Sequence, residues 1–179
     1  MENNFNSRAM GMGKIIKKLA LLLLVICISS CNYGFKGSAP PQGIKTIFIP
    51  NIPDKSGFGL PTLGDDMTQL LKTKFIKDNT LEYTEKTLAD GIVTCIVTSV
   101  KDDPLVVQSG ETVSKRKITI IVSVEFQNLK TKKTIWKKDF TNWGEYDSST
   151  GGFSKRNDGI SVAEDKITDD ILLDVTSNW

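Results

Sequence analysis

Residues 115–128 of the chain read KRKITIIVSVEFQN, and this stretch decides the fold. Its apolar side chains recur at every second position: Ile118, Ile120, Val122, Val124 and Phe126. Successive side chains of a β-strand point to opposite faces of the sheet, so this set forms one apolar face. The intervening residues are mostly polar. The pattern predicts a strand over 115–128 that is buried on one face.

Two further β-runs lie on either side of this stretch. Residues 91–100 and 134–143 are rich in β-branched and aromatic side chains, and the polar connection 128–133 suits an antiparallel hairpin. The three runs therefore predict a meander. Shorter runs over 44–50 and 81–84 bring the predicted sheet to four or five strands.

Apolar residues at helical spacing predict two amphipathic helices. The first follows a loop over 51–61 and carries Leu63, Met67, Leu70, Leu71 and Phe75. The second follows a loop over 148–158, rich in glycine and serine, and carries Ile160, Ala163, Ile167, Ile171 and Val175. The order β-α-β-β-β-α predicts an α+β two-layer sandwich, with both helices on one face of a mostly antiparallel sheet. The opposite face is expected to be mixed and polar.

The N-terminal segment has the parts of a secretory signal. The cations Lys14, Lys17 and Lys18 precede an apolar run over 19–28, and two serines separate this run from Cys31. A transmembrane anchor is the alternative interpretation. A membrane span needs ~20 apolar residues, which is about twice the length of this run.

The residues before Cys31 resemble a bacterial lipoprotein signal, with an aliphatic residue three positions before the cysteine and small residues between. The resemblance implies that residues 1–30 are a signal peptide and that Cys31 carries covalent diacylglycerol and N-acyl lipid. We expect residues 31–43, which contain several glycines and prolines, to form a lipidated tether, and residues 44–179 to form a single domain.

The charge of the chain gives no indication of nucleic-acid binding. The full sequence has 23 basic and 21 acidic residues and a formal net charge of +2 at pH 7. Residues 1–30 hold four of the basic residues and one of the acidic residues, so residues 31–179 carry a net charge of −1. An anionic ligand must therefore meet a local cationic patch.

The chain has no histidine, and so it lacks the commonest general base and metal ligand. Acidic pairs at 65–66, 102–103 and 169–170 fall in predicted helices or turns, where sequence neighbours do not face each other. We interpret these pairs as solvated faces or as charges at helix N-termini. We expect no enzyme activity, no metal site and no bound cofactor. Cys95 lies in a β-run, which predicts a core residue.

Six short segments, taken in order, resemble the LptE family of lipopolysaccharide-assembly lipoproteins in Bacteroidetes-like bacteria. They lie at 31–37, 45–49, 61–63, 116–126, 146–149 and 178–179. The resemblance implies an outer-membrane lipoprotein that plugs a large β-barrel, LptD, and helps to pass lipopolysaccharide to the outer leaflet. It implies binding without catalysis. Asn32 is not followed by an acidic tract like that of surface-export signals in such bacteria, which favours the periplasmic side of the membrane.

Lipopolysaccharide carries phosphates, which lysine and arginine bind through charge-assisted hydrogen bonds. The candidate lipopolysaccharide-binding residues are Lys115, Arg116 and Lys117 at a strand start, and Lys155 and Arg156 in the glycine-rich loop. A third cationic patch at the hairpin tip contains Lys130, Lys132 and Lys133. The alternative is that these cations only keep turns and strand edges soluble.

The three tryptophans, Trp136, Trp143 and Trp179, allow two interpretations. Aromatic faces can stack on sugars, whereas the usual burial of tryptophan favours packing in the core or at an interface. Trp179 is the last residue of the sequence, and we expect it to contact the barrel partner or, alternatively, to pack on the second helix.

A second resemblance leaves another function open. Residues 47–51, followed by Ser56, Gly57 and a predicted helix, are also similar to the start of CsgG-like secretion lipoproteins and of cell-wall-synthase activators. Such a protein would form a secretion pore or act as an activator module, and a carrier of another amphiphile is a third interpretation. A pore former needs additional membrane-crossing strands of ~9–11 residues, and the long strands here are assigned to the core.

Overall fold

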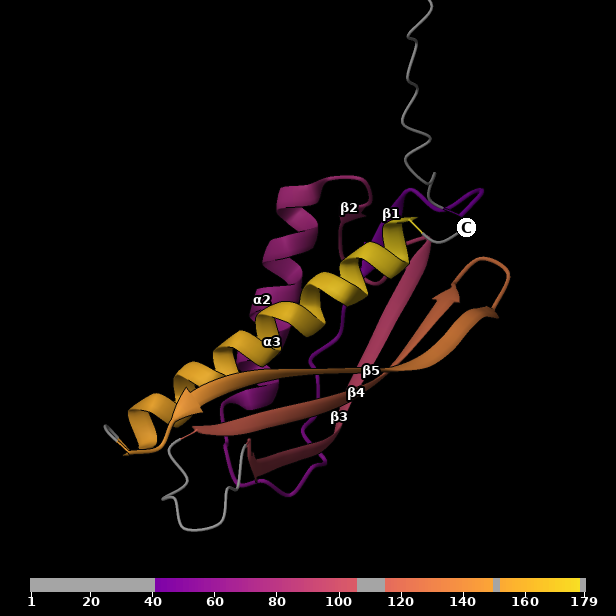
Figure 1. The fold of residues 1–179 in the computed structure, drawn as a ribbon. Helices are drawn as coiled ribbons and strands as arrows, with labels where there is room; N and C mark the ends of the chain where they lie inside the picture. Colours follow the sequence, from indigo (N-terminus) through magenta and orange to yellow (C-terminus); the bar gives the residue numbers. More distant parts are fainter. Residues whose placement is uncertain (1–40, 106–114, 150–151, 178–179) are drawn as a thin grey trace, which may run out of the picture. The chain divides into compact units, whose positions relative to one another are not determined.

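A computed structural model of the chain describes residues 41–105, 115–149 and 152–177 (Figure 1). The predicted signal peptide, Cys31 and Trp179 lie outside the described residues. The elements are, in chain order, β1 (Thr46–Phe48), α2 (Leu63–Asp78), β2 (Glu82–Tyr83), β3 (Gly91–Pro104), β4 (Lys115–Asn128), β5 (Lys133–Asp147) and α3 (Gly152–Ser177).

The five strands form one mixed sheet in the order β2-β1-β3-β4-β5. The pairs β3–β4 and β4–β5 are antiparallel and account for most of the sheet, whereas the short strand β1 is parallel to both β2 and β3. The predicted meander is therefore confirmed as β3-β4-β5. β4 has the bounds that the sequence predicts because its alternation is unbroken.

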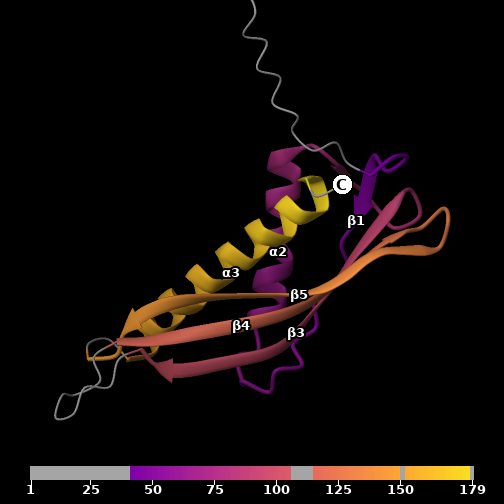
Figure 2. The same ribbon diagram turned by 45° about the vertical axis from the view of Figure 1, so that its right-hand side comes forward.

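Both helices cover the same face of the sheet (Figures 1 and 2). α3 packs along β5 and β4, and α2 packs against α3. α2 carries Asp65 and Asp66 in its first turn and Lys77 in its last turn, which suits the helix dipole. It ends at Asn79, whose φ of 56° is left-handed. The predicted two-layer α+β sandwich is thus confirmed.

The core lies between the helices and the inner face of the sheet. The apolar residues predicted for the second helix and for the strand over 115–128 are all buried, and of those predicted for the first helix only Leu70 remains half-buried. Cys95 is 1% exposed, and burial raises the pKa of its thiol to about 12, as expected for a core residue. No helix within the described ranges combines the length and hydropathy that a membrane span requires.

A register shift in β3 between Val97 and Ser99 changes which of its side chains face the helices. Beyond the shift, Asp102 lies opposite the fully buried Ile118 of β4, so Asp102 is on the helix side of the sheet. An uninterrupted alternation from Val97 would have placed Asp103 there instead. The shift therefore brings a carboxylate to the end of the inner face.

The second helix begins earlier than the sequence predicts. α3 starts at Gly152, whereas the prediction placed a loop up to residue 158, so Lys155 and Arg156 lie in a helix and not in a loop. Gly159 lies inside α3, where a Cβ atom in its place would lie 3.2 Å from the ring of Tyr146 of β5. β1 is shorter than the predicted strand over 44–50, and β3 and β5 are longer than their predicted runs.

Candidate functional site

Two arginines and one carboxylate meet where β3 ends, β4 begins, β5 ends and α3 begins. We call this group the arginine cluster, and it consists of Phe58, Asp102, Arg116, Tyr146 and Arg156. Strand register explains three of the positions, because Arg116 lies opposite Tyr146 on one side and opposite Pro104, two residues after Asp102, on the other. Arg116 and Arg156 were predicted as ligand-binding residues, and the fold brings them to one carboxylate.

The contacts within the arginine cluster converge on Asp102. Arg116 donates from Nε to Oδ1 of Asp102 at 2.8 Å and from a terminal nitrogen to the carbonyl of Asp102 at 2.9 Å. The Tyr146 hydroxyl donates to Oδ2 at 2.8 Å, and Nε of Arg156 lies 3.3 Å from the same oxygen. The guanidinium of Arg156 also lies over the ring of Phe58, 4.2 Å from its centroid. Both guanidinium groups are therefore held in place before any ligand arrives.

The electrostatics of the cluster follow from these contacts. The hydrogen bond to Asp102 raises the pKa of Arg116 above its ordinary value. Burial, together with the hydrogen bond to Asp102, raises the pKa of Tyr146. Tyr146 is consequently a neutral donor at physiological pH, and both arginines are charged. One carboxylate thus faces two guanidinium charges, and the side chains of Arg116 and Arg156 are 31% and 29% exposed.

Lys115 and Lys155 lie beside the arginine cluster. Lys115 is opposite Asp147 in the β4–β5 register. Hydrogen bonds from Ser149 lower the pKa of Asp147, and the charges of Lys115 and Lys155 lower it further, so both lysines are close to this carboxylate. Lys155 also forms an ion pair with Asp158 at 3.2 Å. Two predicted patches, distant in sequence, therefore meet at one end of the sheet.

Lys117 lies on the opposite face of β4 from Arg116, on the face that Lys115 also occupies at the end of the strand. Lys117 directly precedes the buried Ile118, whose side chain points to the helices, so the side chain of Lys117 points to the outer face of the sheet. Its Nζ lies 5.8 Å from the ring centroid of Trp143. The predicted patch of three consecutive cations is thus wrong as a single surface, because neighbouring residues in a strand face opposite ways.

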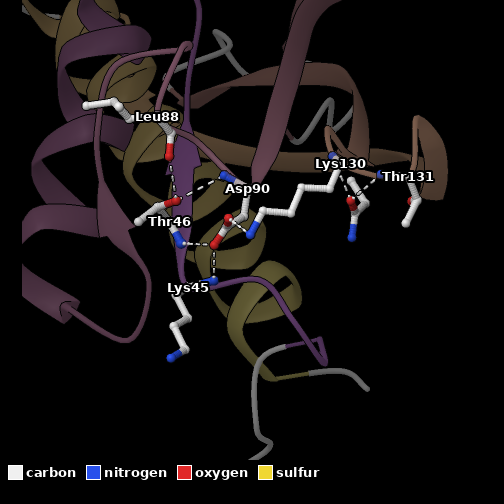
Figure 3. A network of polar contacts seen from close by, with 7 residues as sticks. Lys45, Thr46, Leu88, Asp90, Lys130 and Thr131 are labelled. Carbon is white, nitrogen blue, oxygen red and sulfur yellow. Dashed lines mark hydrogen bonds and ion pairs between the residues drawn. The ribbon is translucent and has the colours of Figure 1, made fainter.

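The cations at the hairpin tip lie at the other end of β4 and β5, and Lys130 has a structural role there (Figure 3). Its Nζ lies 2.5 Å from Asp90. The Asp90 carboxylate also accepts hydrogen bonds from the backbone N–H groups of Lys45 at 2.8 Å and Thr46 at 3.2 Å, and these contacts tie β1 to the hairpin. Lys130 above all lowers the pKa of Asp90, to about 2. Lys130 therefore needs no ligand to explain it.

Sequence reasoning missed Asp102, Tyr146 and Phe58. The pair at 102–103 was predicted in a helix or turn, which is wrong because it lies in β3. The interpretation as solvated is confirmed for Asp103, which is exposed, and is wrong for Asp102, whose side chain is only 18% exposed. The continued β-pattern of polar residues after Val100 was the available signal. Trp179, the predicted partner contact, and Cys31, the predicted lipidation site, lie outside the described residues, so their roles stay predictions.

A cavity of about 370 Å³ lies elsewhere, beside the start of α2. Its walls are formed by Ile52, Asp54, Gly59, Leu60, Pro61, Gly64 and Asp65. Two carboxylates and no cation line it, so it does not suit a phosphate. No three acidic or cysteine side chains within the described part of the chain converge as metal ligands. The arginine cluster is consequently the better candidate for an anionic ligand.

Comparisons with known proteins bear on the fold and the family. Residues 44–175 match the family model LptE, which is described as Lipopolysaccharide-assembly. No curated protein matches the chain.

Several solved structures share the fold. The hypothetical protein CT253 from Chlamydia trachomatis has a TM-score of 0.56 at 11% identity, over 74% of this chain and 95% of that chain. Protein XCC0632 from Xanthomonas campestris has a TM-score of 0.57 at 11% identity, over 75% and 85%. The PelC dodecamer from Paraburkholderia phytofirmans has a TM-score of 0.50 at 11% identity, over 75% and 89%. At these identities the similarity shows a common fold.

Proposed function

The chain belongs to the LptE family of lipopolysaccharide-assembly proteins, and from this premise we propose that it is an outer-membrane lipoprotein that plugs a large β-barrel and assists the passage of lipopolysaccharide. In this proposal the protein binds its ligand and its partner and catalyses no reaction. Three features support the separate parts of the proposal: the N-terminal signal, the two faces of the sheet and the arginine cluster.

The lipid anchor is proposed from the sequence around Cys31. The apolar run, the two serines and the cysteine have the order of a lipoprotein signal. One acyl chain holds a protein to a membrane only marginally, whereas diacylglycerol with a further N-acyl chain gives durable attachment. The tether that follows would place the domain at the periplasmic side of the outer membrane.

The plug role is supported by the contrast between the two faces of the sheet. The inner face is covered by both helices, and neither helix covers the outer face (Figure 2). Along β4 the outer face carries Thr119, Ile121, Ser123 and Glu125, none of which is fully buried. Large outer-membrane barrels have polar interiors, which such a mixed surface can contact. The core does not depend on the partner, because both apolar helix stripes are already buried within the chain.

The arginine cluster is the observation that carries the ligand proposal. Asp102 neutralises one of two guanidinium charges and holds both groups in fixed positions. A guanidinium has five N–H donors. Asp102 accepts hydrogen bonds from Nε and from one terminal nitrogen of Arg116, so further N–H donors of Arg116 stay available for a ligand. Planar donors fixed in this way suit phosphate oxygens. We propose that the phosphates of lipopolysaccharide bind here, with Lys115 and Lys155 as additional cations.

A charge-reversal experiment tests this assignment. Lys115→Glu combined with Lys155→Glu removes the two exposed cations without touching the contacts of Asp102. The matched control is Lys132→Glu combined with Lys133→Glu, two exposed lysines at the other end of the hairpin with the same change in net charge. We expect the first pair to weaken binding of purified lipopolysaccharide at least about tenfold, since each charge-assisted bond contributes roughly 1.5–3 kcal/mol. Equal weakening by both pairs would show that only net charge matters and would remove the site.

A further inference from the structure

Trp143 is exposed to a degree that packing alone does not explain. It lies on the edge strand β5 and is 45% exposed, whereas Trp136 packs against Phe126 and Phe140 with ring centroids 6.0 Å away in each case. Tryptophan is among the more buried residues on average. Val162 on α3, which is 43% exposed, lies close to Gly144, the residue that follows Trp143 in β5. Trp136 therefore packs against the core, whereas Trp143 does not, and contact with a partner or a ligand stays open for Trp143.

A close glycine contact places α3 against this tryptophan. A Cβ atom on Gly144 would lie 2.0 Å from the carbonyl oxygen of Gly159 and 2.9 Å from Cβ of Val162. Only glycine lets β5 and α3 approach so closely. Lys166 lies one helical turn beyond Val162, on the same side of α3. Its Nζ donates to the carbonyl oxygen of Trp143 at 2.9 Å.

Two ammonium groups from different elements accompany the Trp143 ring. Nζ of Lys166 on α3 lies 5.5 Å from the ring centroid, and Nζ of Lys117 on β4 lies 5.8 Å from it. Both distances are near the ~6 Å limit of a cation–π interaction, so the ring is not tightly covered. Within the described residues, neither Lys117 nor Lys166 forms an ion pair with a carboxylate within 4.0 Å. The cross-strand partners of Lys117 are Asp103 on β3 and Glu145 on β5.

We propose that Lys117, Trp143 and Lys166 form a second ligand site, which binds a phosphorylated sugar of lipopolysaccharide. The indole offers a flat apolar surface for the face of a sugar ring, and the two ammonium groups can each donate hydrogen bonds to a phosphate on that sugar. This inference rests on the proposed function for the source of the ligand. The site is distinct from the arginine cluster because Lys117 and Trp143 lie on the opposite face of the sheet from Arg116.

Charge and shape favour a phosphorylated sugar over a neutral sugar or an apolar partner. A neutral sugar could accept hydrogen bonds from the two ammonium groups but would leave their charges uncompensated, whereas a phosphate makes the stronger charge-assisted bonds. An apolar partner would have to cover the ammonium groups at the cost of their hydration. Three side chains from β4, β5 and α3 converge, so the arrangement is fixed by the fold and not by one flexible loop. Lysine stems allow both ammonium groups to move by the small distance that a phosphate requires.

The experiment measures binding of the full lipoprotein, purified in detergent, to lipopolysaccharide. The variants are Trp143→Leu, Trp143→Phe, and Lys117→Gln combined with Lys166→Gln. Lys72→Gln is the matched control, because Lys72 also lies over an aromatic ring, that of Tyr83 at 5.9 Å, but on α2. The probes are intact lipopolysaccharide, the same lipopolysaccharide after removal of its phosphates, and phosphatidylglycerol vesicles. Thermal melting of each variant confirms that it is folded.

We expect Trp143→Leu to weaken binding of both lipopolysaccharide probes at least about fivefold, and Trp143→Phe to retain most of the affinity because an aromatic face remains. The lysine pair should weaken binding of intact lipopolysaccharide at least about tenfold and leave the dephosphorylated probe unchanged. Lys72→Gln should change neither. Vesicle binding should be the same for all variants.

Four results would overturn the proposal. Unchanged affinity of a folded Trp143→Leu variant would remove the sugar contact. Equal loss of vesicle binding would make the patch a phospholipid surface. If a variant recovers less of the β-barrel partner but binds lipopolysaccharide with unchanged affinity, the surface of Lys117, Trp143 and Lys166 is a protein contact. If the native protein binds no lipopolysaccharide at all, the ligand part of the proposed function fails, and the second site fails with it.

Discussion

A buried carboxyl group between the two helices gives the sharpest test of the packing. Glu164 on α3 is 6% exposed, and its Oε1 is buried without a hydrogen-bond partner among the described residues. Burial, together with the charge of Asp66 on α2, raises the pKa of Glu164 from 4.5 to about 7. The ionised form is therefore disfavoured in the folded protein.

The pH dependence follows from the direction of this shift. The unfolded chain releases the Glu164 proton near pH 4.5 and the folded chain near pH 7, so folded stability falls between these values. Each tenfold change in ionisation is worth ~1.4 kcal/mol, so the difference between 4.5 and about 7 corresponds to about 3.5 kcal/mol at most above pH 7. Local relaxation around the carboxylate reduces this, and we expect a loss of about 2–3 kcal/mol. Below pH 4.5 the loss disappears.

Glu164→Gln should remove this dependence. Relative to the native protein, the variant should gain about 2–3 kcal/mol on going from pH 4 to pH 8, measured by urea unfolding at both values. Asp66→Asn should produce a smaller gain, because burial is the larger cause of the shift. Glu85→Gln, at an exposed position, is the control and should show no gain. If the difference in unfolding free energy between the native protein and Glu164→Gln is the same at pH 4 and pH 8, the raised pKa of Glu164 is contradicted.

Further predictions concern the Asp90 contacts, the glycine contact and the arginine cluster. Asp90→Asn should destabilise the fold by about 1–2 kcal/mol at pH 7. The pKa of Asp90 is lowered from 3.8 to about 2, so this difference in stability should vanish as the pH falls through that range. A difference of the same size at pH 2 would contradict this prediction. Gly144→Ala should destabilise the fold by about 2–3 kcal/mol, because its Cβ would lie 2.0 Å from a backbone oxygen. Gly159→Ala should change stability by less than about 1 kcal/mol, because the nearest atom to its Cβ is a side-chain atom at 3.2 Å. Thermal melting compares the two variants, and equal effects would be inconsistent with the close approach at Gly144. Tyr146→Phe should cost about 0.5–1.5 kcal/mol, and Asp102→Asn should cost more, because it loosens both arginines as well; denaturant unfolding that ranks the two variants the other way would show that Asp102 is not the centre of the cluster.

The sequence predicted the elements whose patterns are unbroken. The alternation from Ile118 to Phe126 predicted β4 with its bounds, and the stripe from Leu63 to Phe75 predicted α2. The start of α3 was predicted too late because the glycines and serines of 148–158 were interpreted as a loop, whereas the helix begins at Gly152. In the structure Gly159 permits close packing against Tyr146, which is a tertiary effect.

The candidate site was predicted only in part. Arg116 and Arg156 were both identified, but their meeting at Asp102 depends on a register shift in β3 and on the early start of α3, and neither is visible in a local pattern. The separation of Lys117 from Arg116, by contrast, follows from strand alternation and could have been predicted. The exposure of Trp143 depends on which strand lies at the edge of the sheet, and the sequence did not predict the strand order.

We propose that this chain works inside a large outer-membrane barrel. Affinity purification of the native lipoprotein through a C-terminal tag, followed by mass spectrometry of the intact complex, tests it most directly. The account predicts that one large β-barrel protein is recovered in equal amount with the chain, together with lipopolysaccharide. Recovery of the chain alone, or of an assembly made only of its own copies, would contradict the account.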